Sequence, residues 1–189
     1  MQALLVSLSS VTLAEIGDKT QLLTLFLATR FAAKNAIILA ILMATLINHG
    51  FSAYFGLWLS SLLPTNGQSW LLGLSFIAVG LWLLIPDKDD ENDARLFKYG
   101  AFLTSFVLFS LAEIGDKTQV ATVLLGANFP QTAQVILGST LGMLIANLPI
   151  IYAGNYIMKK INLVKSRSFA CGLFLSLGIA TIGLPMLKL

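Results

Sequence analysis

The sequence predicts an all-α integral membrane protein with six transmembrane helices, arranged as two inverted three-helix repeats with both termini outside. Three observations support this fold class. Of the 189 residues, 57% are hydrophobic and only 11% are charged, whereas soluble domains carry about a quarter charged residues. Six apolar stretches are long enough to cross a bilayer, and one segment occurs twice, once in each half of the chain.

The six apolar stretches define the expected helices. A helix needs roughly 20 mostly apolar residues to cross the hydrocarbon core of a bilayer. The breaks between the stretches contain prolines, glycines, asparagines or charged residues, as expected for loops. Because the runs are long and do not alternate with polar residues, a membrane barrel is not expected. The stretches cover residues 2–28, 35–59, 69–86, 98–126, 131–157 and 169–187.

The positive charges predict the orientation. Nine of the 12 Lys and Arg residues fall in the expected loops after the first, third and fifth stretches. Basic loops stay in the cytoplasm, so these three loops should face inward and both termini outward. The nine residues are Arg30, Lys34, Lys88, Arg95, Lys98, Lys159, Lys160, Lys165 and Arg167.

An internal repeat divides the chain into halves. The segment Leu13–Gln21, LAEIGDKTQ, recurs unchanged at Leu111–Gln119, an offset of 98 (from 13 to 111). We therefore expect a first repeat in residues 1–86, a charged cytoplasmic linker in 87–97 and a second repeat in 98–189. Three helices per half is an odd number, so the second half must enter the membrane from the opposite face. Many secondary transporters share this inverted plan and bind their substrate near the midplane, between the repeats.

The repeated segment carries buried acids. Of the nine carboxylates in the chain, five lie in the linker and the other four are Glu15, Asp18, Glu113 and Asp116. A charge at the bilayer centre costs at least about 2.5–3.5 kcal/mol, so these four must be paired, protonated or bound to a ligand. On a straight helix Glu15 and Asp18 would share one face.

The ligand types favour a hard divalent cation. Four carboxylates with the amides of Gln21 and Gln119 form an oxygen-rich set, and the chain has only one Cys and one His. Such a set suits Mn²⁺ or Ca²⁺, transported rather than tightly bound. Four carboxylates with Lys19 and Lys117 sum to −2, which one divalent ion neutralises. Protons compete for the same oxygens, and that competition is the basis of an antiporter.

Other residues have expected supporting roles. Lys19 and Lys117 can pair with the carboxylates four residues earlier, and Thr20 and Thr118 complete the motif. Gly17 and Gly115 allow the helix to loosen or unwind, although the sequence does not decide whether it does. Three polar residues of the second and fifth stretches could be secondary ligands or proton relays, or could make interhelical hydrogen bonds. They are Asn48, His49 and Asn147.

The motif resembles one particular family. Glu-x-Gly-Asp-(Lys/Arg)-(Thr/Ser), present twice in a small six-helix chain, is similar to the calcium/manganese cation–proton exchangers of the Golgi, of chloroplasts and of bacteria, where members export manganese. The match covers residues 15–20 and 113–118 without departure. The resemblance implies exchange of a divalent metal for protons at a site formed by the two motifs. The chain has neither the long leader nor the enlarged central loop of eukaryotic members, which implies a multi-pass protein of a bacterial plasma (inner) membrane.

Other functions remain open at this stage. An exporter of a small cationic organic solute or a passive cation channel would use the same plan. Paired intramembrane acids also occur in aspartyl proteases, but here each acid pair has a lysine beside it, so an enzyme is not expected. A purely structural scaffold would tolerate charge-neutral replacement of the motif. The expected partners are divalent ions, protons and the lipid bilayer; an oligomer is compatible with the sequence, and no nucleic-acid partner is expected.

Overall fold

The computed structural model describes residues 1–63, 65–85, 98–160 and 162–186, and this part of the chain is helical without strands. The predicted linker 87–97 lies outside the described residues. The helices are α1 (Gln2–Glu15), α2 (Lys19–Arg30), α3 (Lys34–Ser61), α4 (Thr65–Trp82), α5 (Gly100–Glu113), α6 (Lys117–Asn128), α7 (Thr132–Lys160) and α8 (Leu163–Met186).

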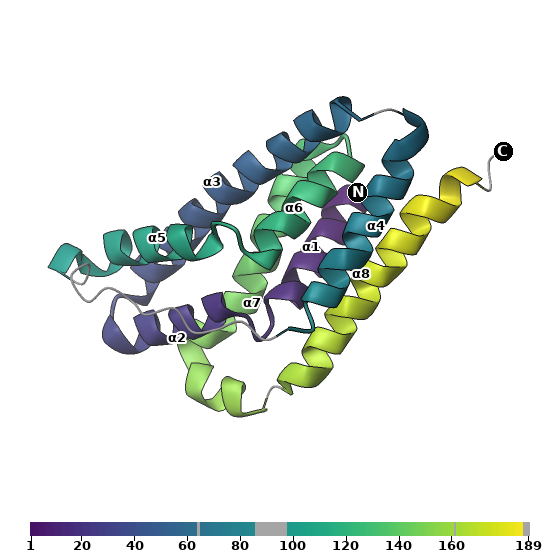
Figure 1. Cartoon of the computed structure of the whole chain (residues 1–189). Coiled ribbons are helices and arrows are strands. Elements are labelled where there is room, and N and C mark those ends of the chain that lie inside the picture. Colours follow the sequence, from purple (N-terminus) through teal and green to yellow (C-terminus); the bar gives the residue numbers. More distant parts are fainter. Residues whose placement is uncertain (64, 86–97, 161, 187–189) are drawn as a thin grey trace.

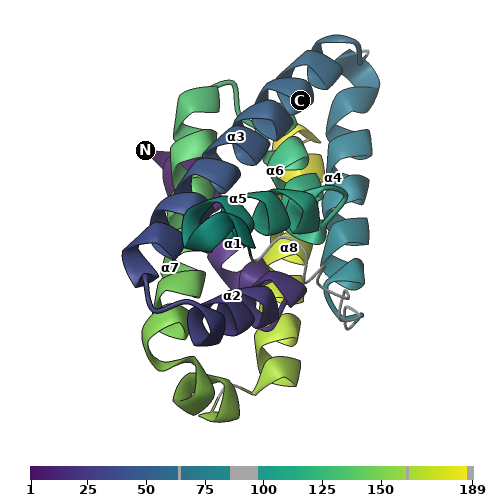
Figure 2. The ribbon, with the colours of Figure 1, turned by 90° about the vertical axis from the view of Figure 1, so that its left-hand side faces the viewer.

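The helices form one bundle. α4 and α8 lie side by side along one edge, and α2 and α5 lie at the opposite edge, with α1, α6 and α7 between them (Figure 1). Turned by 90°, the molecule shows α2 and α5 in front, crossing the longer helices behind them (Figure 2). α7 packs on α1 and α2, and α3 packs on α5 and α6. Each long helix of one half therefore contacts both parts of the broken helix of the other half.

Two of the six predicted helices are each broken into two. The sequence left open whether the stretches 2–28 and 98–126 are continuous, and the structure shows that they are not: α1 ends at Glu15 before α2 begins at Lys19, and α5 ends at Glu113 before α6 begins at Lys117. The physical reason is the backbone of Gly17 and Gly115, which have φ angles of 85° and 75°. A right-handed helix cannot continue through that conformation, which glycine adopts at little cost.

Some boundaries also differ from the prediction. α8 begins at Leu163, so Lys165 and Arg167 belong to a helix and not to the preceding loop. α4 begins at Thr65, inside the loop expected at 63–67. In both cases polar residues lie within the first two turns of the helix, among them Lys165 and Arg167 in α8 and Thr65 and Asn66 in α4. Hydrophobicity alone therefore placed the start of the helix too late.

The surface is that of a membrane protein. Three helical segments are long and apolar enough to cross a bilayer, Lys34–Ser61, Thr132–Gly154 and Val164–Gly183. Shorter apolar helices cover Gln2–Glu15, Gln68–Trp82 and Gly100–Glu113. Large apolar side chains point outward, among them Phe51 and Phe169, which are 72% and 70% exposed. Acids, amides and hydroxyls are buried instead, an arrangement that suits lipid as the surrounding solvent.

The two halves make reciprocal contacts across the α4–α8 pair. Gly73 packs against Gly178, and Cys171 packs against Gly80. Gly80 and Gly178 are 98 residues apart, as are Gly73 and Cys171; we call two residues 98 positions apart mates. The second contact therefore joins the residues that correspond, in the other half, to those of the first. Between them the rings of Phe76 and Phe174, also 98 apart, face each other with centroids separated by 6.1 Å. The local contacts between α4 and α8 are thus reciprocal between positions 98 residues apart.

Candidate site between the two helix breaks

The two helix breaks bury all four acids of the repeated motif. Glu15 is the last residue of α1 and Asp18 the cap residue that precedes α2. Glu113 and Asp116 hold the same positions between α5 and α6. None of the four is more than 4% exposed. The C-terminal end of a helix, which carries partial negative charge, thus meets the N-terminal end of another helix in each motif.

The remaining residues of the motif stabilise the break. The backbone N–H of Gly17 donates to Oε1 of Gln21 at 2.8 Å, and that of Gly115 donates to Oε1 of Gln119 at 2.6 Å. These bonds satisfy backbone donors that the interrupted helices leave without a helical partner. An amide oxygen has two lone pairs, so each glutamine oxygen can bind a metal ion while it accepts this hydrogen bond. The role of both glutamines as metal ligands stays a prediction.

The threonine of each motif binds the glutamate of the same motif. The hydroxyl of Thr20 donates to Oε1 of Glu15. The hydroxyl of Thr118 lies 3.3 Å from Oε2 of Glu113 and 3.2 Å from Oδ2 of Asp116. Each threonine therefore reaches back across the break and orients the carboxylate on the other side of it.

The first glutamate is held by the second half of the chain. Nδ2 of Asn147 on α7 donates to Oε1 of Glu15 at 3.0 Å. Oδ1 of the same amide accepts from the hydroxyl of Thr24 at 2.7 Å. Nε2 of Gln21 donates to the carbonyl of Ala146 at 2.9 Å. Within the described residues Oε2 of Glu15 is buried without a hydrogen-bond partner.

The second glutamate has a different neighbour. Nε2 of His49 on α3 lies 3.5 Å from Oε2 of Glu113, and both side chains are fully buried. Oε1 of Glu113 has no hydrogen-bond partner among the residues that the structure describes. Asn48, beside His49, bonds from Nδ2 to the carbonyl of Ser110 at 3.2 Å and so joins α3 to α5. Of the two residues, only the histidine reaches an acid.

The two motifs interact electrostatically. The carboxylate of Glu15 is close enough to Glu113 and Asp116 to be repelled by both. Lys19 of the first motif attracts Glu113 of the second, and Lys117 donates from Nζ to the carbonyl of Ile85 at 2.6 Å. Three non-helical residues separate each lysine from the glutamate four residues earlier, so the pairing of the two stays a prediction that no longer rests on helical spacing.

The site is not a preformed metal cage. Among the described residues, no three Asp, Glu, His or Cys side chains converge closely enough to hold a metal ion. The predicted set of four carboxylates is brought to one region but not to one point. What the arrangement provides is a buried excess of negative charge at which a cation and protons can replace one another.

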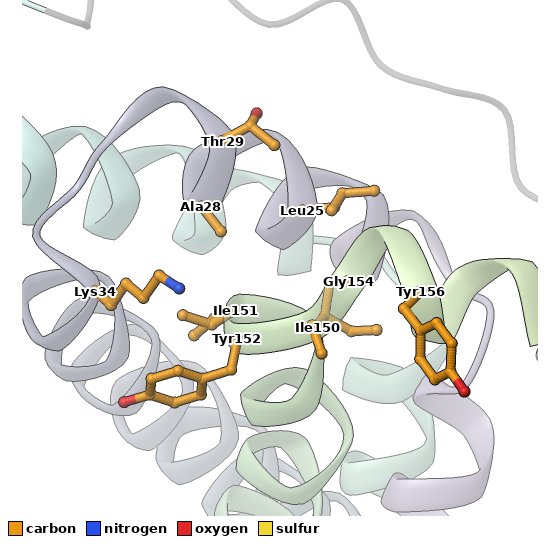
Figure 3. Close-up of a pocket in the computed structure, with 10 residues that line it drawn as sticks. Leu25, Ala28, Thr29, Lys34, Ile150, Ile151, Tyr152, Gly154 and Tyr156 are labelled. Atoms are coloured by element: carbon orange, nitrogen blue, oxygen red, sulfur yellow. The ribbon is translucent and has the colours of Figure 1, made fainter.

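A pocket of about 300 Å³ lies between α2, the start of α3 and α7 (Figure 3). Its wall includes Leu25, Ala28 and Gly154, and Lys34 lies 5.2 Å from the centre of the Tyr152 ring. α7 contains Pro149 and is kinked at Ala153, where φ is −139° and ψ is 26°. Proline cannot donate the helical hydrogen bond and clashes with the preceding turn, so Pro149 perturbs the turn before it, whereas the kink at Ala153 lies after it.

The residues 98 positions away from several of those that line this pocket are tightly packed. In the other half, a Cβ on Gly56 would overlap the carbonyl oxygen of Val123, and one on Gly126 would overlap that of Ala53. The residues 98 positions away are Gly154, Leu25, Ala28 and Ile151, all of which line the pocket. The α3–α6 contact is therefore closed, whereas the corresponding α2–α7 contact leaves a pocket.

Two residues of this region were missed by the sequence prediction. Thr24 orients Asn147, and Arg167 donates from its guanidinium to the carbonyl of Gly17 at 3.3 Å. Thr24 could have been found from the repeat, because its mate is also a threonine, Thr122. Arg167 could not, because it was assigned to a loop.

Both halves of the chain match a family of known proteins. The family model described as "Divalent cation/proton antiporter GDT1" matches residues 3–91 and 101–184. A protein of Vibrio cholerae serotype O1 named "Putative manganese exporter" is 44% identical over 182 residues, which cover 96% of this chain and 90% of that protein. GDT1-like protein 4 of Oryza sativa subsp. indica is 26% identical over 98% of this chain and 74% of the rice protein.

No solved structure matches the chain. The relationship to a bacterial protein is consistent with the inner-membrane location expected from the sequence. The family is one of transporters and not of enzymes. The two buried motifs and a family match over both halves lead to one conclusion: the chain belongs to the GDT1 family of divalent cation/proton antiporters.

Proposed function

We propose that the protein exports Mn²⁺ from a bacterial cytoplasm in exchange for protons, at a site between its two helix breaks. The observation that carries this proposal is the pair of mirrored glutamates. Glu15 and Glu113 are fully buried, repel each other and each have one oxygen without a partner in the described structure. Manganese is the choice of metal because a relative with 44% identity is named as an exporter of it.

The charge balance favours exchange. Four buried acids and the two motif lysines leave a net charge of −2. One divalent cation neutralises this charge, and so do two protons. Burying an uncompensated charge in a membrane is costly, so the empty, deprotonated site is the least stable state. Loading by either ion, but not by both at once, is the energetic requirement for an antiporter.

We place this site near the middle of six membrane spans. In this arrangement α1 with α2 forms one span and α5 with α6 another, while α3, α4, α7 and α8 each form one. Residues 1–86 and 98–189 are then inverted repeats joined by the linker 87–97, with both termini outside. The reciprocal contacts of α4 with α8 support the two-fold relationship, and broken helices at the substrate site are typical of inverted-repeat transporters.

The metal ligands in this proposal are Glu15, Asp18, Glu113 and Asp116, with Gln21 and Gln119 as further oxygen donors. Because these groups do not converge on one point, ion binding must draw the two breaks together. The pocket between α2 and α7, which is lined in part by Lys34 of the predicted cytoplasmic side, is the proposed inner entrance. The closed α3–α6 contact is its counterpart on the outer side.

Transport by the purified protein in sealed proteoliposomes tests the proposal. With an acidic lumen, we expect Mn²⁺ to accumulate inside as protons leave. Asp116→Asn should abolish this uptake, and Phe51→Ala, which alters a side chain exposed to lipid, should leave it unchanged. Mn²⁺ uptake that ignores the pH gradient would indicate a channel. No uptake of any divalent ion by correctly folded protein would refute metal transport.

A further inference from the structure

The two halves of the site differ at one pair of mates. His49 on α3 and Asn147 on α7 are 98 residues apart, and each faces the glutamate of the opposite half. Asn147 is fully engaged, since its amide donates to Glu15 and to the carbonyl of Met143 and accepts from Thr24. His49 makes no hydrogen bond with any described residue through either ring nitrogen, although it is fully buried.

An unbonded buried imidazole needs an explanation. Leaving a buried polar group without a partner costs about 1–3 kcal/mol, and burying two such nitrogens costs more. The asparagine at the mate position shows that this fold can satisfy a polar side chain there with ordinary hydrogen bonds. The histidine is therefore not required by the packing of α3. A ligand absent from the described chain would account for it.

The distance between His49 and Glu113 suits a shared metal ion. Nε2 and Oε2 are 3.5 Å apart, beyond the 2.7–3.2 Å of ordinary N–H···O hydrogen bonds. Two adjacent ligands bonded at about 2.2 Å to one ion are about 3.1–3.6 Å apart. Oε1 of Glu113 is also without a partner in the described structure, so the carboxylate has an oxygen available for the same ion.

The other glutamate is less available. Oε1 of Glu15 already accepts hydrogen bonds from Asn147 and Thr20. The corresponding oxygen of Glu113, Oε2, has a longer contact with the hydroxyl of Thr118, of 3.3 Å, besides the neighbouring ring of His49 at 3.5 Å. An ion that enters the region thus meets more open ligand atoms at the second motif than at the first.

On the basis of the proposed function, we propose that His49 is a direct nitrogen ligand of the transported ion, held together with Glu113, and that it makes the site prefer divalent transition metals to Ca²⁺. Calcium takes oxygen ligands almost exclusively. Imidazole nitrogen is a common ligand of divalent transition metals. One nitrogen in an otherwise oxygen-rich set therefore lowers the relative affinity for Ca²⁺ without demanding the Cys or multiple His of a zinc site.

Pulsed electron paramagnetic resonance on the purified protein with bound Mn²⁺ tests the ligand directly. We expect a nitrogen coupling of imidazole type in the wild-type protein. His49→Asn, which copies the residue of the other half, should remove the coupling. In competition uptake by proteoliposomes the same variant should lower the preference for Mn²⁺ over Ca²⁺ by at least about tenfold, because even the loss of a group that only supports a metal ligand costs about ten- to a hundredfold. Phe51→Ala on the same helix should change neither measurement.

The outcomes separate the two proposals. If the wild-type protein binds and transports Mn²⁺ without a nitrogen coupling, His49 is not a ligand, whereas the proposed function stands. An unchanged Mn²⁺/Ca²⁺ preference in a folded His49→Asn variant would overturn the selectivity role. If the wild-type protein neither binds nor transports divalent ions, the proposed function fails first. The wild-type spectrum needs no variant, so misfolding of His49→Asn would not leave the ligand assignment undecided.

Discussion

Gly17 and Gly115 adopt nearly the same left-handed backbone, with φ angles of 85° and 75°, at matching points of two helices from opposite halves of the chain. Each lies between a buried glutamate and a buried aspartate of its motif. The glycines turn two helix interiors into two pairs of helix ends. The repeated motif therefore has two roles: it interrupts a helix, and it supplies charged groups.

The first prediction concerns this backbone. A Cβ on Gly115 would meet no atom within 4 Å, so the cost of Gly115→Ala is conformational, about 1–2 kcal/mol. We expect a lower Tm in detergent and reduced transport. Gly172→Ala is the matched control, because its Cβ also meets nothing within 4 Å and α8 is continuous there. That change should be neutral or slightly stabilising, since alanine favours helix. Equal effects of the two changes would show that the left-handed conformation is not needed.

The second prediction concerns the closed and open sides. Gly56→Ala places a methyl group against the backbone of Val123 and Ala127, where neither can move easily, and should destabilise the protein by about 1–3 kcal/mol. Its mate change, Gly154→Ala, meets the side chain of Leu25 and should cost less. Gly50→Ala, in open space on α3, is the control. Thermal unfolding of the three variants checks this order, and a larger loss for Gly154→Ala would contradict the open side.

The third prediction concerns the hydrogen bonds of Asn147. Asn147→Ala removes a donor from Glu15 and an acceptor from Thr24. We expect a loss of about 1–3 kcal/mol of stability, because both partners stay buried. Replacing Thr24 as well, by valine, should cost less than the sum of the two single changes, since one of the orphaned groups is removed. A double-mutant cycle by thermal unfolding measures this, and strict additivity would argue that the two side chains do not interact.

The fourth prediction concerns stabilisation by the substrate. A ligand that binds only the folded protein at one hundred times its Kd raises stability by about 2.7 kcal/mol. Mn²⁺ should therefore raise the Tm of the wild-type protein, and chelation should reverse the shift. Glu113→Gln should show a normal starting Tm and little or no shift with Mn²⁺. A full shift in that variant would place the ion elsewhere.

The repeat made much of this site predictable. The offset of 98 residues by itself singles out the four buried acids, the glycines beside them and the pair His49 and Asn147. The hydrogen-bond roles of Gln21 and Gln119 were not predictable, because they depend on a break that a helical pattern treats as continuous. The break in the helical spacing assumed for Lys19 and Glu15 was not predictable for the same reason, because one left-handed glycine changes the neighbours on either side of it. Helix starts that are followed closely by charged residues, such as Lys165 and Arg167 in α8, are not detected from hydrophobicity alone.

The reciprocal contact of α4 with α8 has a consequence for how the two halves can differ. In an isologous dimer the same surface patch of each subunit forms the interface. Here the two corresponding surfaces, of α4 and α8, lie in one polypeptide. In a dimer of identical chains any substitution appears on both sides of the axis. Covalent linkage removes that constraint, and the chain shows the result, with histidine opposite asparagine at the acids and glycine opposite alanine at Gly126 and Ala28.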